Sequence, residues 1–173
     1  MQTSTLLKPN CYVNDAAFDW LYPERIQLLS RRHWTPLSIA KSAARFLANE
    51  PGKKILDIGS GVGKFCLVGA RYYPEASFYG IEQRKELYQY AQEAKAATQV
   101  KNASFIHGNF TQTDLSAYDG FYFYNAFFEN LVDQDQIDNE VEYSTSLYNY
   151  YCRFMFKKLE RSVSGTRLVT YHS

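Results

Sequence analysis

The stretch Leu56-Asp57-Ile58-Gly59-Ser60-Gly61-Val62-Gly63 decides the fold of this 173-residue chain. Its three glycines directly follow the short apolar run Lys54–Ile58, and a helical pattern from Lys64 to Tyr73 comes after them. Glycine lets the backbone turn tightly and approach a ligand closely, and the start of a helix offers free N–H groups. The pattern therefore predicts a strand, a ligand-binding loop and a helix.

Short apolar runs and helical patterns alternate through the rest of the chain. We expect further strands at Ser77–Ile81, Ala103–Ile106, Gly120–Tyr124 and Arg167–Tyr171, and helices at Arg84–Thr98 and Ser144–Val163. Such alternation is typical of a parallel sheet with helices on both faces. Right-handed crossovers then place ligands at the carboxyl ends of the strands. The predicted fold class is α/β, with a doubly wound, mostly parallel sheet.

A helical region precedes this core and extends to about Asn49. Thr35 is the expected N-cap of its last helix, with Pro36 at the first helical position, and Pro51-Gly52 ends that helix. We expect a single domain over residues 1–173, with an N-terminal helical cap at 1–50 and a Rossmann-like core at 51–173.

Composition and charge exclude several classes of protein. The hydrophobic fraction of 46% and the net charge of +1 are typical of a globular protein and not of a disordered one. The three cysteines, Cys11, Cys66 and Cys152, are widely spaced, so we expect neither a disulfide framework nor a metal site. No apolar run approaches the roughly 20 residues that span a bilayer, which predicts a cytoplasmic protein without membrane contact.

The spacing of the glycines distinguishes three kinds of cofactor loop. A phosphate-binding P-loop needs four residues between its glycines and a hydroxyl after its lysine. Here Gly59–Gly63 is one residue short, and Phe65 stands at the hydroxyl position. The dinucleotide fingerprint also fails, because its third glycine would come one position later. A GxGxG loop remains, with Asp57 two positions before the first glycine.

This loop resembles motif I of class I, Rossmann-like methyltransferases, and the resemblance implies S-adenosyl-L-methionine as the cofactor. Glu82 ends the second predicted strand, 23 residues after Gly59, where a carboxylate can accept hydrogen bonds from both ribose hydroxyls. Gly108-Asn109-Phe110 departs from the acidic residue usual in this class, although the Asn109 amide oxygen can accept from the adenine amine. The expected cofactor-binding residues are Asp57, Gly59, Ser60, Gly61, Gly63, Glu82, Gln83, Asn109 and Phe110.

The acceptor side of the site is expected after the fourth strand. Asn125-Ala126-Phe127-Phe128 resembles, without its prolines, the Asn-Pro-Pro-Tyr/Phe element of amine- and amide-directed methyltransferases, which makes Asn125 the candidate catalytic residue. The alternative is that Asn125 only caps the strand. The same segments also resemble the histone-lysine methyltransferases that lack a SET domain. The two resemblances together imply methylation of a nitrogen, on a lysine-like protein side chain or on a small amine.

Charge distribution bears on the same question. From Asn102 to Cys152 there is no Lys or Arg but there are eight acidic residues, which favours a cationic or amine-bearing acceptor. The cluster Arg31-Arg32-His33 keeps a nucleic-acid acceptor as the second hypothesis, and a non-catalytic binding protein is the third. Glu129 and Tyr124 are candidates to assist deprotonation by position alone. The segment Phe18–Thr35 is either a lid over the cofactor or part of the core.

The end of the sequence raises a last expectation. The methyltransferase sheet usually has seven strands, and here the last two are apparently absent, since only Arg167–Tyr171 remains at the end. That strand would be an exposed edge, which proteins normally cover. Three explanations stay open: the sequence is truncated after this strand, another chain pairs with the edge in an oligomer, or an N-terminal segment covers it.

Overall fold

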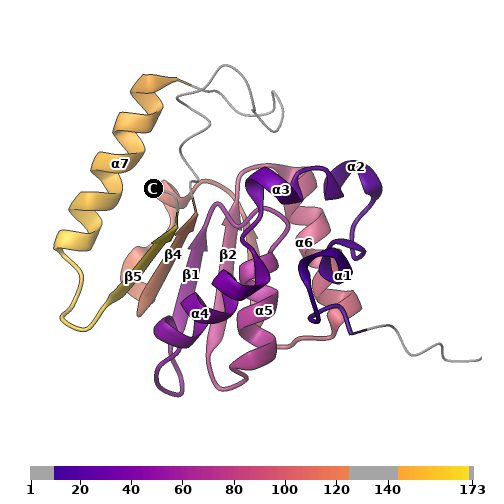
Figure 1. Ribbon diagram of the computed structural model, residues 1–173. Coiled ribbons are helices and arrows are strands. Elements are labelled where there is room, and N and C mark those ends of the chain that lie inside the picture. Colours follow the sequence, from indigo (N-terminus) through magenta and orange to yellow (C-terminus); the bar gives the residue numbers. More distant parts are fainter. Residues whose placement is uncertain (1–9, 125–143, 172–173) are drawn as a thin grey trace, which may run out of the picture.

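The computed structural model describes residues 10–124 and 144–171, and its centre is one five-stranded parallel sheet (Figure 1). The strand order is β3-β2-β1-β4-β5, and every neighbouring pair is parallel. The strands are β1 (Lys54–Ile58), β2 (Ser77–Glu82), β3 (Ala103–His107), β4 (Gly120–Tyr124) and β5 (Arg167–Tyr171). The predicted α/β fold with a doubly wound sheet is confirmed. Strands β2 and β3 are each one residue longer than expected.

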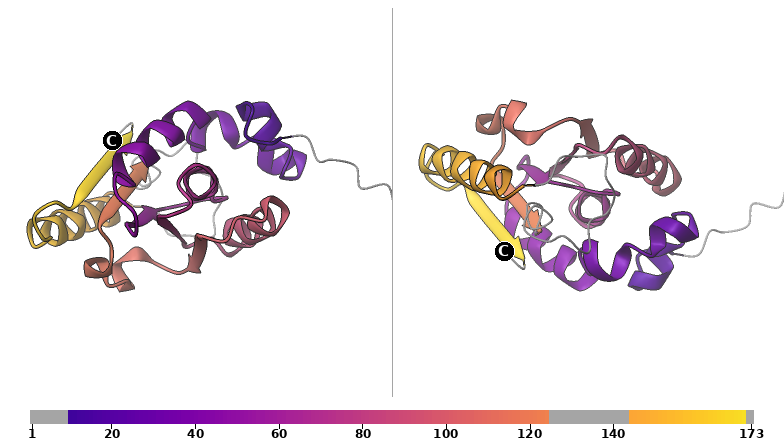
Figure 2. Two further views of the ribbon diagram at one scale, coloured as in Figure 1. Left: turned by 90° about the horizontal axis from the view of Figure 1, so that it is seen from below. Right: turned by 90° about the horizontal axis from the view of Figure 1, so that it is seen from above.

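Helices cover both faces of the sheet (Figure 2). One face packs against α4 (Leu37–Leu47), α5 (Lys64–Tyr72) and α6 (Lys85–Thr98). The other face packs against α7 (Thr145–Glu160) and two 3-10 turns, η1 (Phe110–Gln112) and η2 (Leu115–Ala117). Successive strand residues point to opposite faces, so Phe121 joins the α7 cluster while Tyr122 joins the α4–α5 cluster. The sheet is therefore buried on both sides.

Three short helices precede α4: α1 (Asp15–Asp19), α2 (Glu24–Gln27) and α3 (Ser30–His33). The predicted start of α4 is wrong by one residue, because Pro36 is the N-cap and Leu37 the first helical residue. The Thr35 hydroxyl is hydrogen-bonded to the Tyr122 hydroxyl, at 2.9 Å. Asp15 Oδ1 accepts a hydrogen bond from the Leu37 N–H, at 2.9 Å, and thus takes the capping role from a different helix.

The N-terminal segment is fastened to the glycine loop and to α5. Lys64 Nζ lies 2.6 Å from Asp15 Oδ1 and 3.4 Å from Asp19 Oδ1, and the lysine side chain is buried. The Tyr22 hydroxyl donates to the Val62 carbonyl, at 2.9 Å. This anchoring makes the N-terminal helices part of the same structure as the loop.

Of the two interpretations of the segment Phe18–Thr35, the structure shows core packing for most of its aromatic residues. Phe18, Tyr22 and Trp34 are buried in the α4–α5 cluster, whereas Trp20 is 80% exposed. At the other side of the sheet, β5 is the edge strand of the described part, with Leu168 40% exposed. No helix within residues 10–124 and 144–171 is long and apolar enough to cross a membrane.

Candidate functional site

The glycine loop between β1 and α5 has the backbone conformation that its sequence predicts. Gly59, Gly61 and Gly63 have φ angles of 74°, 53° and 84°, in the left-handed region that side chains disfavour. The N–H groups of Gly59 and Ser60 both donate to the Ile81 carbonyl, each at 3.0 Å, so the loop folds over the end of β2. A Cβ at Gly63 would lie 2.4 Å from the Phe105 ring, so this position also requires close packing.

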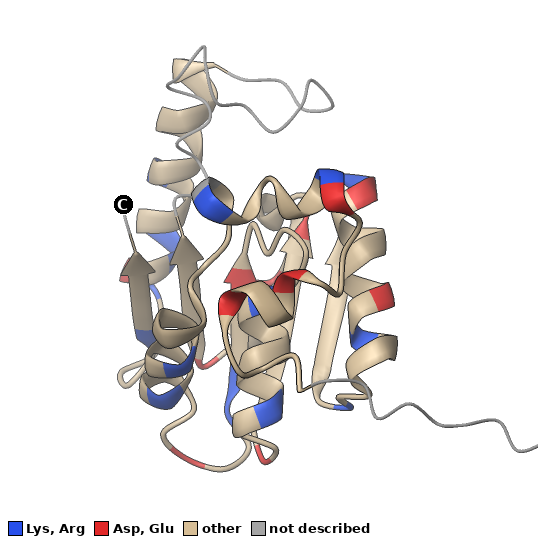
Figure 3. Cartoon of the chain, turned by 45° about the vertical axis from the view of Figure 1, so that its right-hand side comes forward, with Lys and Arg blue, Asp and Glu red and all other residues tan. Residues whose placement is uncertain are grey.

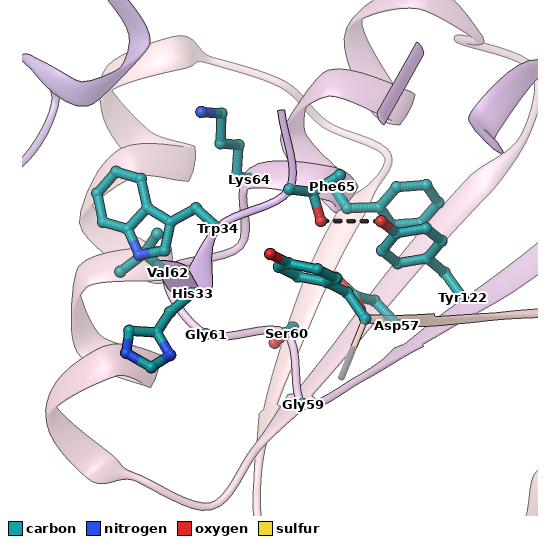
Figure 4. A pocket seen from close by; sticks show the side chains of 12 residues that line it. His33, Trp34, Asp57, Gly59, Ser60, Gly61, Val62, Lys64, Phe65 and Tyr122 are labelled. Atoms are coloured by element: carbon teal, nitrogen blue, oxygen red, sulfur yellow. Dashed lines mark hydrogen bonds between the residues drawn. The ribbon is translucent and has the colours of Figure 1, made fainter. Parts of the chain in front are cut away.

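A pocket opens beside this loop, at the carboxyl ends of β1 and β4 (Figure 4). Its walls come from three parts of the sequence: the end of β1 with the loop and the start of α5, the end of β4, and the last residue of α3 with the two residues that follow it. The lining residues are His33, Trp34, Thr35, Asp57, Gly59, Ser60, Gly61, Val62, Lys64, Phe65, Tyr122 and Tyr124. The strand ends are where a doubly wound sheet binds its ligand.

Two features of the loop suit a bound molecule. The Ser60 hydroxyl oxygen is buried and has no hydrogen-bond partner among the described residues. A Cβ at Gly61 would have no non-neighbouring described atom within 4 Å, so the backbone there borders open space. A buried hydroxyl without a partner is uncommon, because its desolvation is not compensated. A polar ligand against the loop would satisfy Ser60 and fill the space beside Gly61.

Asp57 supplies a buried carboxyl group to this pocket and is only 3% exposed. Burial raises its pKa well above the ordinary value, and the neighbouring Glu82 carboxylate raises it further. The hydrogen bond that it receives from Cys66 Sγ, at 3.8 Å, acts in the opposite direction. A positively charged group in the pocket would stabilise the ionised form of Asp57. The site is therefore suited to a ligand with a cationic part.

Glu82 is buried at the end of β2 and holds the loop with its carboxylate. Oε2 accepts from the Gly61 N–H and Oε1 accepts from the Arg84 N–H, both at 2.9 Å. The Arg84 guanidinium lies 3.6 Å from Oε1. A carboxylate is the kind of group that accepts from ribose hydroxyls, and the ribose contact of Glu82 stays a prediction. Gln83, the next residue, is exposed and accepts through Oε1 from Asn109 Nδ2, at 3.1 Å.

Asn109 and Phe110, expected to contact adenine, have other partners in the structure. Asn109 Oδ1 accepts from the Thr111 N–H at 3.0 Å and caps η1, while Nδ2 donates to the Tyr151 hydroxyl at 2.8 Å. Phe110 is buried and packs edge-on against the rings of Tyr151 and Phe154. Both adenine contacts stay predictions, and binding adenine through Asn109 Oδ1 would have to coexist with the η1 cap.

The acceptor side is only partly described. Asn125, Glu129 and most of the acidic segment lie outside the described residues, so their roles stay predictions. Tyr124 does line the pocket, and burial raises the pKa of its hydroxyl. A phenol with a raised pKa stays protonated at neutral pH and therefore has no free base form to accept a proton, which argues against Tyr124 as the proton acceptor.

Several lining residues were not among the expected site residues. Lys64 directly follows the loop and Tyr122 lies on β4, whereas Trp34 and Thr35 line the pocket because the N-terminal helices pack against α5 and β4. Figure 3 shows some acidic positions near the centre of the view and others on the right-hand helices and in the loops at the bottom, while most Lys and Arg positions lie on helices. Among the described residues, no group of three or more His, Cys, Asp or Glu side chains is placed to hold a metal ion.

Comparison with known proteins gives one family and a small set of similar sequences. A profile described as a methyltransferase domain matches residues 49–149. The 23S rRNA (uracil(1939)-C(5))-methyltransferase RlmD of Shewanella sp. strain ANA-3 is 35% identical over 79 residues, which are 46% of this chain and 17% of that protein. The release factor glutamine methyltransferase of Thermodesulfovibrio yellowstonii is 33% identical over 63 residues, 36% of this chain and 23% of that protein.

Among solved structures, TrmN from Thermus thermophilus has a similar fold, with a TM-score of 0.62 at 17% identity. The similarity covers 84% of this chain and 41% of TrmN, and it supports the fold class alone. The sequence matches cover less than a quarter of the length of each curated relative. The more specific resemblance to lysine methyltransferases without a SET domain is not confirmed by these comparisons.

Proposed function

This chain belongs to the methyltransferase domain family, and on that premise we propose that it binds S-adenosylmethionine in the pocket beside Gly59–Gly63 and methylates an acceptor nitrogen. One observation supports the donor site above all: a buried Ser60 hydroxyl without a partner, open space at Gly61 and the buried Asp57 carboxyl group line a single pocket. S-adenosylmethionine supplies a methyl group on a positively charged sulfur, together with an ammonium, a carboxylate and an adenosine.

Each part of this donor has a matching group on the chain. We assign the ribose hydroxyls to Glu82, whose carboxylate oxygens already hold the loop at the end of β2. The ammonium is assigned to Asp57, because a positive charge beside this buried carboxyl group would favour its ionised form. Ser60 Oγ would donate to, or accept from, the amino-acid end of the donor. The chain's contribution is to hold the donor and to exclude water from it.

The described pocket favours a neutral or cationic acceptor. Its one described carboxyl group is Asp57, and its lysine, Lys64, is ion-paired with Asp15 and Asp19. The remaining walls include the aromatic rings of Trp34, Phe65, Tyr122 and Tyr124. A protonated amine would have to lose a proton before attack, and Glu129 is the candidate by its position in the sequence. Asn125 stays the candidate that orients the acceptor nitrogen.

A nitrogen on an RNA base is the second candidate. The specific observation in its favour is the similarity to a 23S rRNA methyltransferase, at 35% identity over 79 residues. Methylation at a uracil carbon would need a nucleophile that adds to the ring first, ordinarily a thiolate. Cys66 is buried and its pKa is raised well above the ordinary value, and neither Cys11 nor Cys152 lines the described pocket. The described site thus suits nitrogen better than carbon.

Calorimetry and a transfer assay test the proposal separately. We expect S-adenosylmethionine and S-adenosylhomocysteine to bind with micromolar affinity, and no binding of either at millimolar concentration would overturn the donor assignment. Methyl-labelled donor is then added to a cell lysate divided into protein, RNA and small-molecule fractions. Label in protein or small amines supports the first candidate, label in RNA supports the second, and binding without transfer indicates a non-catalytic relative.

Replacing Glu82 by Gln should weaken S-adenosylhomocysteine binding by about tenfold, because a charged acceptor for the ribose hydroxyls becomes a neutral one. Glu86→Gln is the matched control: its carboxylate pairs with Arg25 on the outside of α6 and does not line the pocket. Isothermal titration at constant pH measures both. Equal affinities of the two variants would contradict the assignment of Glu82.

A further inference from the structure

We propose that Tyr22 positions the glycine loop for S-adenosylmethionine by holding the Val62 carbonyl with its hydroxyl, which makes the N-terminal segment part of the cofactor site. Tyr22 is a positioning residue in this proposal, because it acts through the loop and not on the cofactor itself. The inference rests on the proposed function, since it concerns the same loop. Tyr22 precedes the residues matched by the methyltransferase family, which begin at residue 49.

The peptide group between Val62 and Gly63 is held at both of its polar atoms. Its carbonyl accepts a hydrogen bond from the Tyr22 hydroxyl at 2.9 Å, and its N–H donates to the Ser60 carbonyl at 2.8 Å. The second of these bonds closes a tight turn that contains Gly61, the residue that borders open space in the pocket. Tyr22 therefore holds the same turn beside which we place the cofactor.

The Val62 carbonyl needs a hydrogen-bond donor from outside the helix that follows it. Val62 is buried, and a buried carbonyl without a hydrogen-bond donor is costly. The Gly63 carbonyl accepts from the Leu67 N–H at 3.0 Å, so the hydrogen bonds of α5 begin one residue after Val62. The Tyr22 hydroxyl supplies the bond that the helix does not. Without this hydroxyl, the peptide group would be free to rotate and the turn would lose one of its anchors.

Tyr22 is itself fixed in the turn between α1 and α2. Its N–H donates to the Asp19 carbonyl at 3.0 Å, and its carbonyl accepts from Gln27 Nε2 at 2.8 Å. Its ring packs against Phe18 and, edge-on, against Trp34, with centroids 6.0 Å and 4.9 Å away. Burial raises the pKa of the hydroxyl well above its ordinary value, so the hydroxyl keeps the proton that it donates. An anchor held in this way preorganises the loop and lowers the cost of ordering it on binding.

Tyr22→Phe removes the hydroxyl and keeps the packing of the ring. We expect this variant to bind S-adenosylhomocysteine about fivefold more weakly, because the ligand must then order a loop that has lost one hydrogen bond. Tyr12→Phe is the comparison variant, since the Tyr12 side chain is also buried but its hydroxyl donates, at 3.5 Å, to the Leu67 carbonyl within α5. Tyr12→Phe should bind like wild type. Isothermal titration measures the affinities, and thermal melts show that the variants are folded.

Amide hydrogen exchange gives a readout that a general loss of stability would not move. In free Tyr22→Phe the Gly63 amide should exchange about fivefold faster than in wild type, relative to the Phe78 amide in the sheet. The Phe78 N–H donates to the Asn102 carbonyl at 2.8 Å, so its exchange reports opening of the core. Because coupling between two parts of a protein is reciprocal, S-adenosylhomocysteine should in turn slow exchange at the Tyr22 amide of wild type.

The outcomes separate this inference from the proposed function. If wild type does not bind S-adenosylhomocysteine, the proposed cofactor site itself fails. If wild type and Tyr22→Phe bind it equally well, Tyr22 does not position the loop, while the proposed function stands. Equal weakening in Tyr22→Phe and Tyr12→Phe, or weaker binding without faster exchange at Gly63, would also overturn the inference, because the effect would then lie outside the loop. Should Tyr22→Phe not fold, the wild-type Tyr22 amide decides: slower exchange with ligand supports the inference, and unchanged exchange overturns it.

Discussion

Replacing Gly61 by Val is expected to reduce S-adenosylhomocysteine affinity by about 100-fold or more, below detection in an ordinary titration. Gly61 has a φ of 53° and borders open space, so its new side chain would meet no described atom of the protein. The branched side chain would instead project into the region that we assign to the donor. The expected loss is therefore steric exclusion of the ligand rather than collapse of the core.

Gly52→Val is a matched control for the backbone effect of this substitution. Gly52 also has a positive φ, 80°, and a Cβ there would again meet nothing within 4 Å among the described residues. It lies before β1, at the opposite end of the strand from the loop. Both variants should lose about 1–2 kcal/mol of stability through left-handed strain, but only Gly61→Val should lose binding. Equal loss of binding in both variants would reject the loop as the donor site.

Much of the sheet could be predicted because each strand has its own local signal. The apolar runs Lys54–Ile58, Gly120–Tyr124 and Arg167–Tyr171 coincide with β1, β4 and β5. The two central runs, Lys54–Ile58 and Gly120–Tyr124, are mostly apolar because strands in the middle of a parallel sheet are buried on both faces. The conformation of the loop could also be predicted from its three glycines. All three have left-handed backbone angles, which other residue types rarely adopt.

The wall of the pocket opposite the loop could not be predicted, because it depends on contacts between distant residues. His33–Thr35 reach the loop through the Lys64 ion pair with Asp15, 49 positions away, and through the Thr35–Tyr122 hydrogen bond, 87 positions away. Contacts between distant residues also explain why the N-cap of α4 was wrongly predicted at Thr35. Thr35 has the right residue type for an N-cap, but its hydroxyl is bonded to β4, and Asp15 receives the helix N–H instead.

The side-chain partners of Asn109, on the cofactor side of the site, could not be predicted from the sequence either. Its position after β3 suggested an adenine contact, yet its oxygen caps η1 and its amide nitrogen reaches Tyr151 on α7. Sequence spacing placed the residue correctly at the strand end but gave no information about these partners. Spacing thus predicted the glycine loop and the strand ends around the proposed donor site, while the side-chain contacts there come from the packing of the helices.

Asp57→Asn should stabilise the free protein and at the same time weaken donor binding, an opposition that distinguishes a binding residue from a structural one. The buried Asp57 carboxyl group has a pKa well above its ordinary value of 3.8, so the ionised form is disfavoured in the folded state. An amide of the same shape carries no charge to desolvate. We expect the Tm of Asp57→Asn to exceed that of wild type at pH 7 by about 3 °C, for about 1 kcal/mol in a chain of this size.

The sign of the pH dependence follows from the raised pKa. Asp57 keeps its proton in the folded state at pH values where the unfolded chain has lost it, so its contribution to stability is fully present below about pH 4. That contribution is lost as the pH rises toward the folded-state pKa. The Tm difference between Asp57→Asn and wild type should therefore be small near pH 4 and grow toward neutral pH, which a series of thermal melts measures.

In donor binding, unlike in stability, wild type should exceed Asp57→Asn, because the ammonium of the ligand favours the ionised form of Asp57. We expect S-adenosylhomocysteine to bind Asp57→Asn at least about tenfold more weakly at pH 7, and wild type to release protons on binding in the acidic range. Titrations in two buffers of different ionisation enthalpy measure that release. A variant that is both less stable and weaker in binding would show that Asp57 supports the fold. A variant more stable but unchanged in affinity would show that the ammonium lies elsewhere.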